Sequence, residues 1–138
     1  MSSSDFSAVT VSGLSKYKQE LLELLGEVVL KPTFPESELD VLKQQTLSNL
    51  AQSRKDPSDL AGKLRRKLVY GETGYGLYQT EESVASISRD DLIAFHGEHF
   101  KPNNASLAIV GDVDAKEIRK AVEMTFKDWK KGEVPELP

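Results

Sequence analysis

Residues 33–70 read TFPESELDVLKQQTLSNLAQSRKDPSDLAGKLRRKLVY, and this stretch decides most of the fold. Leucines recur through its first half at helical spacing with polar residues between them, which predicts a helix ending at about Ser53. Asp56-Pro57 then places a capping side chain before a proline suited to a first helical turn. A second helix is therefore expected to follow directly and to stop near Gly71.

Two motifs have the spacing of a capping box, in which side chains satisfy backbone N–H groups left free at a helix start. The first pairs Thr33 with Glu36, and the second pairs Ser88 with Asp91 and opens a helix that Pro102 closes. Apolar periodicity predicts three further helical segments, at residues 15–30, over a short turn at 80–87, and from about residue 114 to 132.

Two segments are typical of strands. Residues 6–12 alternate imperfectly between apolar and polar side chains, and residues 105–110 form a short apolar run without alternation. Two strands make a poor sheet on which to bury so many helix faces, so strands are missing from this inventory. We therefore expect an α/β (α+β) fold in which a mixed sheet packs against several helices, completed by a longer chain or by a partner.

Composition excludes several classes of protein. The 138 residues include 18 basic and 22 acidic side chains, for a net charge of -4, whereas a nucleic-acid-binding protein typically carries a basic stripe. The sequence contains no cysteine, which excludes disulfides, thiolate zinc sites and cysteine nucleophiles within it. Its apolar stretches are too short to span a membrane, and no signal peptide is recognisable. We therefore expect neither a nucleic-acid nor a membrane partner.

Residues 63–78 hold the most basic run of the chain, at residues 63–67, followed by a glycine-rich segment. With Leu64 and Leu68 buried, as the helical pattern predicts, the basic run is expected to be a solvated face. The glycine-rich segment lacks the Gly-Lys-Ser/Thr ending of a phosphate-binding loop. It is interpreted as a turn held by the rings of Tyr70 and Tyr75.

His96 and His99 are the only histidines in the sequence, and Glu98 lies between them. Three residues apart on a helix, the two imidazoles could share a metal ion, which would make the chain a small metalloenzyme. Their spacing departs from the H-E-x-x-H and H-x-x-E-H motifs of zinc proteases, and no third ligand is indicated. We therefore favour an interpretation in which both rings extend the aromatic side formed by Phe95 and Phe100.

Two other residues have ordinary explanations. Trp129, which follows Phe126 by about one turn, is expected to anchor the last helix rather than to bind a ligand. Asn104 begins an Asn-x-Ser glycosylation motif, but it enters a predicted core strand, so we interpret the match as coincidence.

A set of short phrases runs through the chain from about Phe6 to Trp129. In order they are Val11-Ser12-Gly13-Leu14, Leu30-Lys31-Pro32-Thr33-Phe34-Pro35-Glu36, Lys43-Gln44-Gln45, Asp56-Pro57, Leu68-Val69-Tyr70-Gly71, Ile87-Ser88-Arg89-Asp90-Asp91-Leu92, Pro102-Asn103-Asn104-Ala105 and Ile109-Val110-Gly111-Asp112-Val113. This order resembles the insulinase-like, or pitrilysin-like, zinc metallopeptidases, the family that includes the mitochondrial processing peptidase. The ordered set, rather than any single phrase, carries the resemblance.

The resemblance implies a bowl-like architecture of repeated α/β half-domains that enclose unfolded peptides for cutting. A half-domain of this family starts with strands and a helix bearing H-x-x-E-H, and this motif is absent here. The family's third zinc ligand, a glutamate, falls on Asn49, and no Asp or Glu occurs between Asp40 and Asp56. An uncharged amide replaces that carboxylate poorly. The resemblance therefore implies that this chain has no catalytic, cofactor-binding or metal-ligating residue.

The same resemblance sets the expected organisation. Residues 1–4 should be disordered, 5–132 should form a partial, non-catalytic half-domain truncated at its N-terminal side, and 133–138 should form a linker. A catalytic half-domain or subunit of the same family would hold zinc, while this chain contributes packing, part of the peptide chamber and an exposed strand edge for the peptide substrate. The alternative is a stand-alone helical interaction module without a role in proteolysis. The compartment is not specified by the sequence, although an exported bacterial parent would place it in the periplasm.

Overall fold

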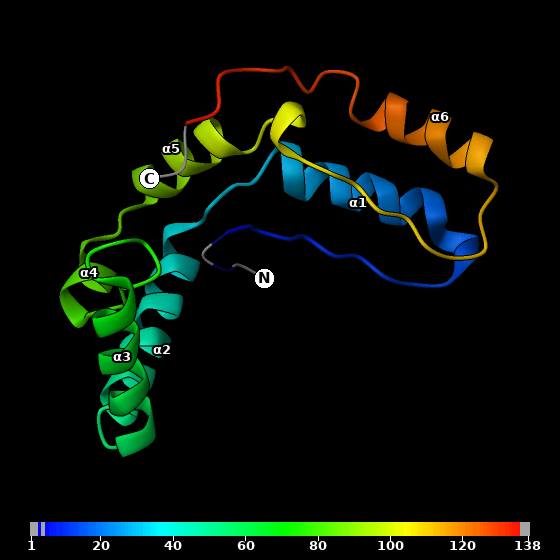
Figure 1. Cartoon of the computed structure of the whole chain (residues 1–138). Coiled ribbons are helices and arrows are strands. Elements are labelled where there is room, and N and C mark those ends of the chain that lie inside the picture. Colours follow the sequence, from blue (N-terminus) through cyan, green and yellow to red (C-terminus); the bar gives the residue numbers. More distant parts are fainter. Residues whose placement is uncertain (1–2, 4, 136–138) are drawn as a thin grey trace. The chain divides into compact units, whose positions relative to one another are not determined.

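The computed structural model describes residue 3 and residues 5–135 of the chain (Figure 1). The disorder expected of residues 1–4 and the linker expected at 133–138 therefore lie largely outside the described part. The chain divides into two units, which are described separately. Unit 1 comprises the residues up to Thr33 together with residues 95–135, and unit 2 comprises residues 34–94.

Helices are the regular secondary structure of both units. They are α1 (Lys18–Leu30), α2 (Glu36–Ser53), α3 (Pro57–Tyr70), α4 (Glu81–Ser86), α5 (Arg89–His99) and α6 (Ala115–Thr125), with short 3-10 turns η1 (Ser15–Tyr17) and η2 (Pro102–Asn104). The helices predicted from apolar periodicity are thus present, although the last ends at Thr125 rather than near Gly132. Across the described residues, none of the helices has the length and apolar character needed to cross a membrane.

Two of the predicted helix starts are confirmed by their hydrogen bonds. Asp56 accepts a hydrogen bond from the backbone N–H of Ser58 at 2.8 Å, and Pro57 is the first residue of α3. At the start of α5, the backbone N–H of Ser88 donates to Asp91 Oδ2 at 2.7 Å, and the N–H of Asp91 donates to Ser88 Oγ at 3.2 Å. Both arrangements satisfy N–H groups that a helix start leaves free.

The capping box of α5 makes its contribution to stability depend on pH. Hydrogen bonds from the side chain and backbone of Ser88 lower the pKa of Asp91, and the nearby charge of Lys43 acts in the same direction. A carboxyl whose pKa is lowered by folding stabilises the fold above its unfolded-state pKa and loses that contribution as the pH falls through the folded-state pKa. The melting-temperature difference between wild type and Asp91→Asn should therefore be positive at pH 7 and shrink below about pH 4.

The matched control for this prediction is Asp90→Asn, which removes a carboxylate from the same first turn without touching the capping box. Its melting temperature, followed by circular dichroism over the same pH series, measures the general effect of negative charge at a helix N-terminus. An Asp91→Asn difference that stays constant down to pH 2.5, or that matches the control throughout, would contradict the assignment.

The capping box predicted from Thr33 and Glu36 is wrong. The N-cap of α2 is Pro35, with φ -60°, and no side chain caps this helix. Because Glu36 is the first helical residue, the threonine lies two positions before the N-cap, where its side chain cannot serve as the capping group. Phe34, between them, has a positive φ of 45°, which turns the chain into the helix.

The expected α/β (α+β) fold with a mixed sheet is also wrong for the described residues, which are helical and contain no sheet. Residues 6–12 hold only an isolated bridge at Ser7, and residues 105–110 are extended without strand pairing. A strand is stable only when another strand accepts its backbone hydrogen bonds, and the described residues supply none. The side chains of 105–110 are accordingly exposed, with Val110 96% accessible. Because neither segment forms a strand among the described residues, the predicted strand edge for a peptide substrate is wrong as well.

Unit 1 is built on the contact between α1 and α6. Leu22 and Leu25 of α1 are its buried apolar side chains among the described residues. Gly26 allows α6 to come close, because a Cβ at this position would lie 2.6 Å from Cγ2 of Thr125. The indole Nε1 of Trp129 donates to the carbonyl of Phe100 at 3.0 Å, which ties the segment after α6 to the end of α5.

Unit 2 is built on the contact between α2 and α4, where Val84 is buried. The Lys43 ammonium donates to the carbonyl of Ala85 at 3.0 Å and holds the two helices together. In the segment after α3, the rings of Tyr70 and Tyr75 lie 5.7 Å apart between centroids, which confirms the predicted turn.

The burial predicted for Leu64 and Leu68 is wrong. Their residues on α3 are 60% and 76% exposed, because no element in the described part of unit 2 covers this side of the helix. An amphipathic helix normally buries its apolar stripe. In the described part of the chain, α3 therefore leaves exposed the apolar side chains that a core helix would bury.

Candidate functional site

The two histidines do not come together as a pair of metal ligands. His96 Nε2 lies 2.8 Å from the carbonyl oxygen of Val29, and its ring stacks on Phe100 with centroids 4.6 Å apart. The ring of His99 lies 4.5 Å from that of Phe95. Each imidazole thus packs on an aromatic ring four residues away, which confirms the aromatic interpretation.

The resemblance places Asn49 at the position of the family's third zinc ligand. Asn49 lies in α2 as an exposed residue. Within residues 3 and 5–135, no group of three or more His, Asp or Glu side chains is placed to hold a metal ion.

The remaining sequence candidates have local structural contacts. The ring of Trp129 lies 5.6 Å from that of Phe126, as expected of an anchor for the last helix. The side-chain amide of Asn104 donates to the carbonyl of His99 at 2.9 Å, at the end of η2. In the basic run, Lys63 contacts Asp59 at 2.6 Å, and Arg66 donates to the carbonyl of Tyr75 at 3.2 Å.

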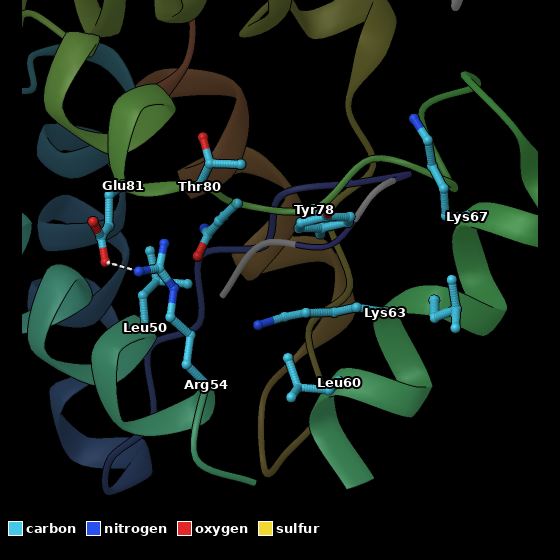
Figure 2. Close-up of a pocket in the computed structure, with 10 residues that line it drawn as sticks. Leu50, Arg54, Leu60, Lys63, Lys67, Tyr78, Thr80 and Glu81 are labelled. Carbon is cyan, nitrogen blue, oxygen red and sulfur yellow. Dashed lines mark ion pairs between the residues drawn. The ribbon is translucent and has the colours of Figure 1, made fainter. Parts of the chain in front are cut away.

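Unit 2 contains a cavity of about 370 Å³ on one side of α3 (Figure 2). Three elements form its walls: the C-terminal part of α2, the exposed side of α3, and the segment that leads into α4. The lining residues are Leu50, Arg54, Leu60, Lys63, Leu64, Lys67, Tyr78, Gln79, Thr80 and Glu81. This volume lies near the lower end of the range for ligand pockets.

The cations of the cavity have acidic neighbours of their own. Arg54 contacts Glu81 at 3.0 Å, the ion pair drawn in Figure 2. Lys63 points across the cavity from α3, and its ammonium donates to Ser53 Oγ of α2 at 3.0 Å. The hydrogen bond from Lys63 lowers the pKa of Asp59, although partial desolvation opposes this effect. Lys63 is therefore held in place within the cavity wall.

The chemistry of the lining is that of a binding site. Leucines and a tyrosine ring offer apolar contact, while the three cations sit beside them. The lining therefore combines apolar contact with positive charge.

One sequence pattern could have indicated this cavity, although it was interpreted only as helical periodicity. Leu60, Lys63, Leu64 and Lys67 follow the i, i+3, i+4, i+7 spacing of a single helix face. The opposite wall could not be predicted, because Leu50 and the residues before α4 reach it only through the packing of unit 2.

Comparison with known proteins gives two independent matches to peptidases. Residues 86–138 match the family described as the Peptidase M16 inactive domain. An uncharacterized zinc protease of Rickettsia bellii (strain RML369-C) is 28% identical over 122 residues, which cover 87% of this chain and 30% of that protein. The chain is thus similar to insulinase-like peptidases.

Other relatives of this chain differ in what their names say of them. The non-peptidase homolog YmxG of Helicobacter pylori (strain ATCC 700392 / 26695) is 25% identical, with 94% of this chain and 31% of that protein covered. The beta subunit of the human mitochondrial-processing peptidase is 26% identical, with 90% and 26% covered. The chain spans less than a third of the length of each of these relatives. Residues 86–138 are thus similar to the inactive domain of such peptidases.

Proposed function

We propose that this chain assembles with a zinc-bearing half or subunit of the same family and forms part of the chamber in which that partner cleaves peptides. The observation that carries the proposal is the match of residues 86–138 to the Peptidase M16 inactive domain. In this role the chain supplies surface and packing, and the reaction takes place on residues of the partner.

The donor chemistry of the chain supports this division of labour. A zinc protease needs a metal-bound water and a carboxylate that activates it. Here an amide stands at position 49, and the ring nitrogen Nε2 of His96 is engaged with the Val29 carbonyl. The exposed apolar stripe of α3 further supports an assembly, because large apolar patches on soluble proteins typically mark interaction sites.

The proposal is tested by co-expressing this chain with an H-x-x-E-H-bearing family member from the same genome. Cleavage of a fluorogenic unfolded peptide is measured for the chain alone, for the partner alone and for the two together. We expect no cleavage by the chain alone and several-fold more cleavage by the complex than by the partner alone. Activity of the complex should be abolished by 1,10-phenanthroline and by replacing the partner's catalytic glutamate.

Two results would contradict the proposal. Chelator-sensitive cleavage by this chain alone would place the chemistry here and revive a metal site at the histidines, to be located with His99→Ala. A co-purified pair whose activity equals that of the partner alone would favour the interaction module without a role in proteolysis.

A further inference from the structure

The wall of the cavity formed by α3 has the geometry that receives a side chain from another helix. Leu60, Lys63, Leu64 and Lys67 all line the cavity, and their positions are i, i+3, i+4 and i+7 on one helix. Four residues with this arrangement form the hole into which a facing helix inserts one side chain when helices pack knobs into holes.

The interior of this hole favours an apolar side chain. Leu50 of α2 and the ring of Tyr78 close the cavity on the side opposite α3 (Figure 2). Leu60 and Leu64, which line the cavity, are 48% and 60% exposed. Filling the cavity with an apolar group would remove this surface from water, which is favourable in proportion to the area covered.

The exposed stripe continues one turn beyond the hole. Leu68 follows Leu64 by four residues and is even more exposed. Leu60 and Leu68 are thus separated by about 12 Å along the helix axis, or roughly two turns. An occupant that presents apolar side chains on successive turns along this line is itself a helix, because ridges of one helix fit between those of another.

The cations beside the apolar stripe of α3 favour an acidic occupant. Lys67 contacts Glu72 at 2.6 Å, but the Glu72 side chain is 82% exposed; Arg54 pairs with Glu81, and these side chains are 62% and 47% exposed. Such exposed pairs contribute little to stability, so these cations can exchange their partners at small cost. A helix that covers the cavity would desolvate them, and carboxylates on that helix would compensate.

We propose that this face of α3 is a docking site for an acidic amphipathic helix of the partner protein. The helix inserts a leucine-like side chain between Leu60 and Leu64, and its glutamates or aspartates pair with Lys67 and Arg54. The identity of the partner rests on the proposed function, whereas the chemistry of its docking helix rests on the cavity and the charges of α3.

The test uses the full chain and a fluorescent 18-residue helical peptide with a leucine stripe flanked by glutamates. Binding is followed by anisotropy, with a lysine-for-glutamate version of the peptide as the charge control. We expect the glutamate peptide to bind and the lysine peptide to bind at least about tenfold more weakly. Affinity for the glutamate peptide should fall as salt is raised, because the flanking charges are partly screened.

Variants of the chain locate the binding surface. Leu64→Ser and Lys67→Glu should each weaken binding by about five- to tenfold. Their matched controls on α6 of unit 1, Met124→Ser and Lys120→Glu, should leave binding unchanged. Leu64, Lys120 and Met124 are exposed and Lys67 is half-buried, so circular dichroism and Trp129 fluorescence should report an intact fold for each variant.

Several outcomes would overturn the docking proposal. These are equal binding of the two peptides, no binding of the glutamate peptide, or equal effects of the test and control variants. Dimerisation of the free chain that Leu64→Ser abolishes would instead assign the face to a second copy. If the peptide binds as expected but the co-expressed partner gains no activity, only the proposed function is contradicted. If activity is gained but Lys67→Glu changes neither assembly nor peptide binding, only the docking site is contradicted.

Discussion

The Leu22→Ala variant is expected to unfold unit 1 under conditions in which the wild type is folded. Leu22 is 4% exposed and is one of only two buried apolar side chains among the described residues of unit 1. Truncating a buried leucine typically costs about 2–5 kcal/mol through lost transfer free energy and an unfilled cavity. A small domain has a total stability of similar size, so this loss should be decisive.

The lone tryptophan makes this effect measurable in unit 1 itself. Trp129 is the single tryptophan of the sequence and lies in unit 1, where its indole contacts Phe100. Urea titration followed by Trp129 fluorescence should show a much lower midpoint for Leu22→Ala. The control is Leu24→Ala on the same helix, which is 50% exposed and should lose far less. Equal midpoints for the two variants would show that the α1–α6 contact is not the core of the unit.

The second large effect is expected at Gly76, which is buried in the turn after α3. A Cβ at this position would overlap the carbonyl oxygen of Gly71. Because the obstacle is backbone rather than the end of a flexible side chain, the turn can accept Gly76→Ala only by changing its path. Overpacking of this kind costs about 1–3 kcal/mol or more. The change should also separate the rings of Tyr70 and Tyr75, which the same turn holds together.

Gly74→Ala is the matched control, since a Cβ at Gly74 would meet no atom within 4 Å. Urea unfolding by far-ultraviolet circular dichroism measures the loss of stability, and the near-ultraviolet tyrosine band reports the ring pair. We expect a reduced midpoint and an altered tyrosine band for Gly76→Ala alone. If both alanine variants behave as wild type, the close approach of Gly76 to Gly71 does not hold the turn.

The helices were predictable because their determinants are local. Asp56-Pro57 and the Ser88–Asp91 pair act within a few residues of the helix start, and the leucine repeat is a property of one helix at a time. The strands could not be predicted in the same way, because strand formation depends on hydrogen-bond partners elsewhere in the chain. Residues 105–110 have the composition of a strand, but composition does not reveal whether such partners exist. Thr33 had the right spacing for a cap, but Pro35 occupies the N-cap position.

The candidate site was predictable only in part. The spacing of Leu60, Lys63, Leu64 and Lys67 is visible in the sequence, yet an amphipathic pattern does not say whether a neighbouring element covers the stripe. The burial predicted for Leu64 failed for this reason. The replacement of a zinc-binding glutamate by Asn49, in contrast, rests on the resemblance alone and stays a prediction.

The tight contact between α1 and α6 constrains how this chain can evolve. A methyl group introduced at Gly26 would collide with the methyl of Thr125, whose branched side chain has little rotational freedom in a helix. Serine at 125 retains the hydroxyl and removes the obstruction. Substitutions at these two positions are therefore expected in a fixed order. Thr125 must first be replaced by a shorter residue, and only then can Gly26 be replaced by a residue with a higher helix propensity.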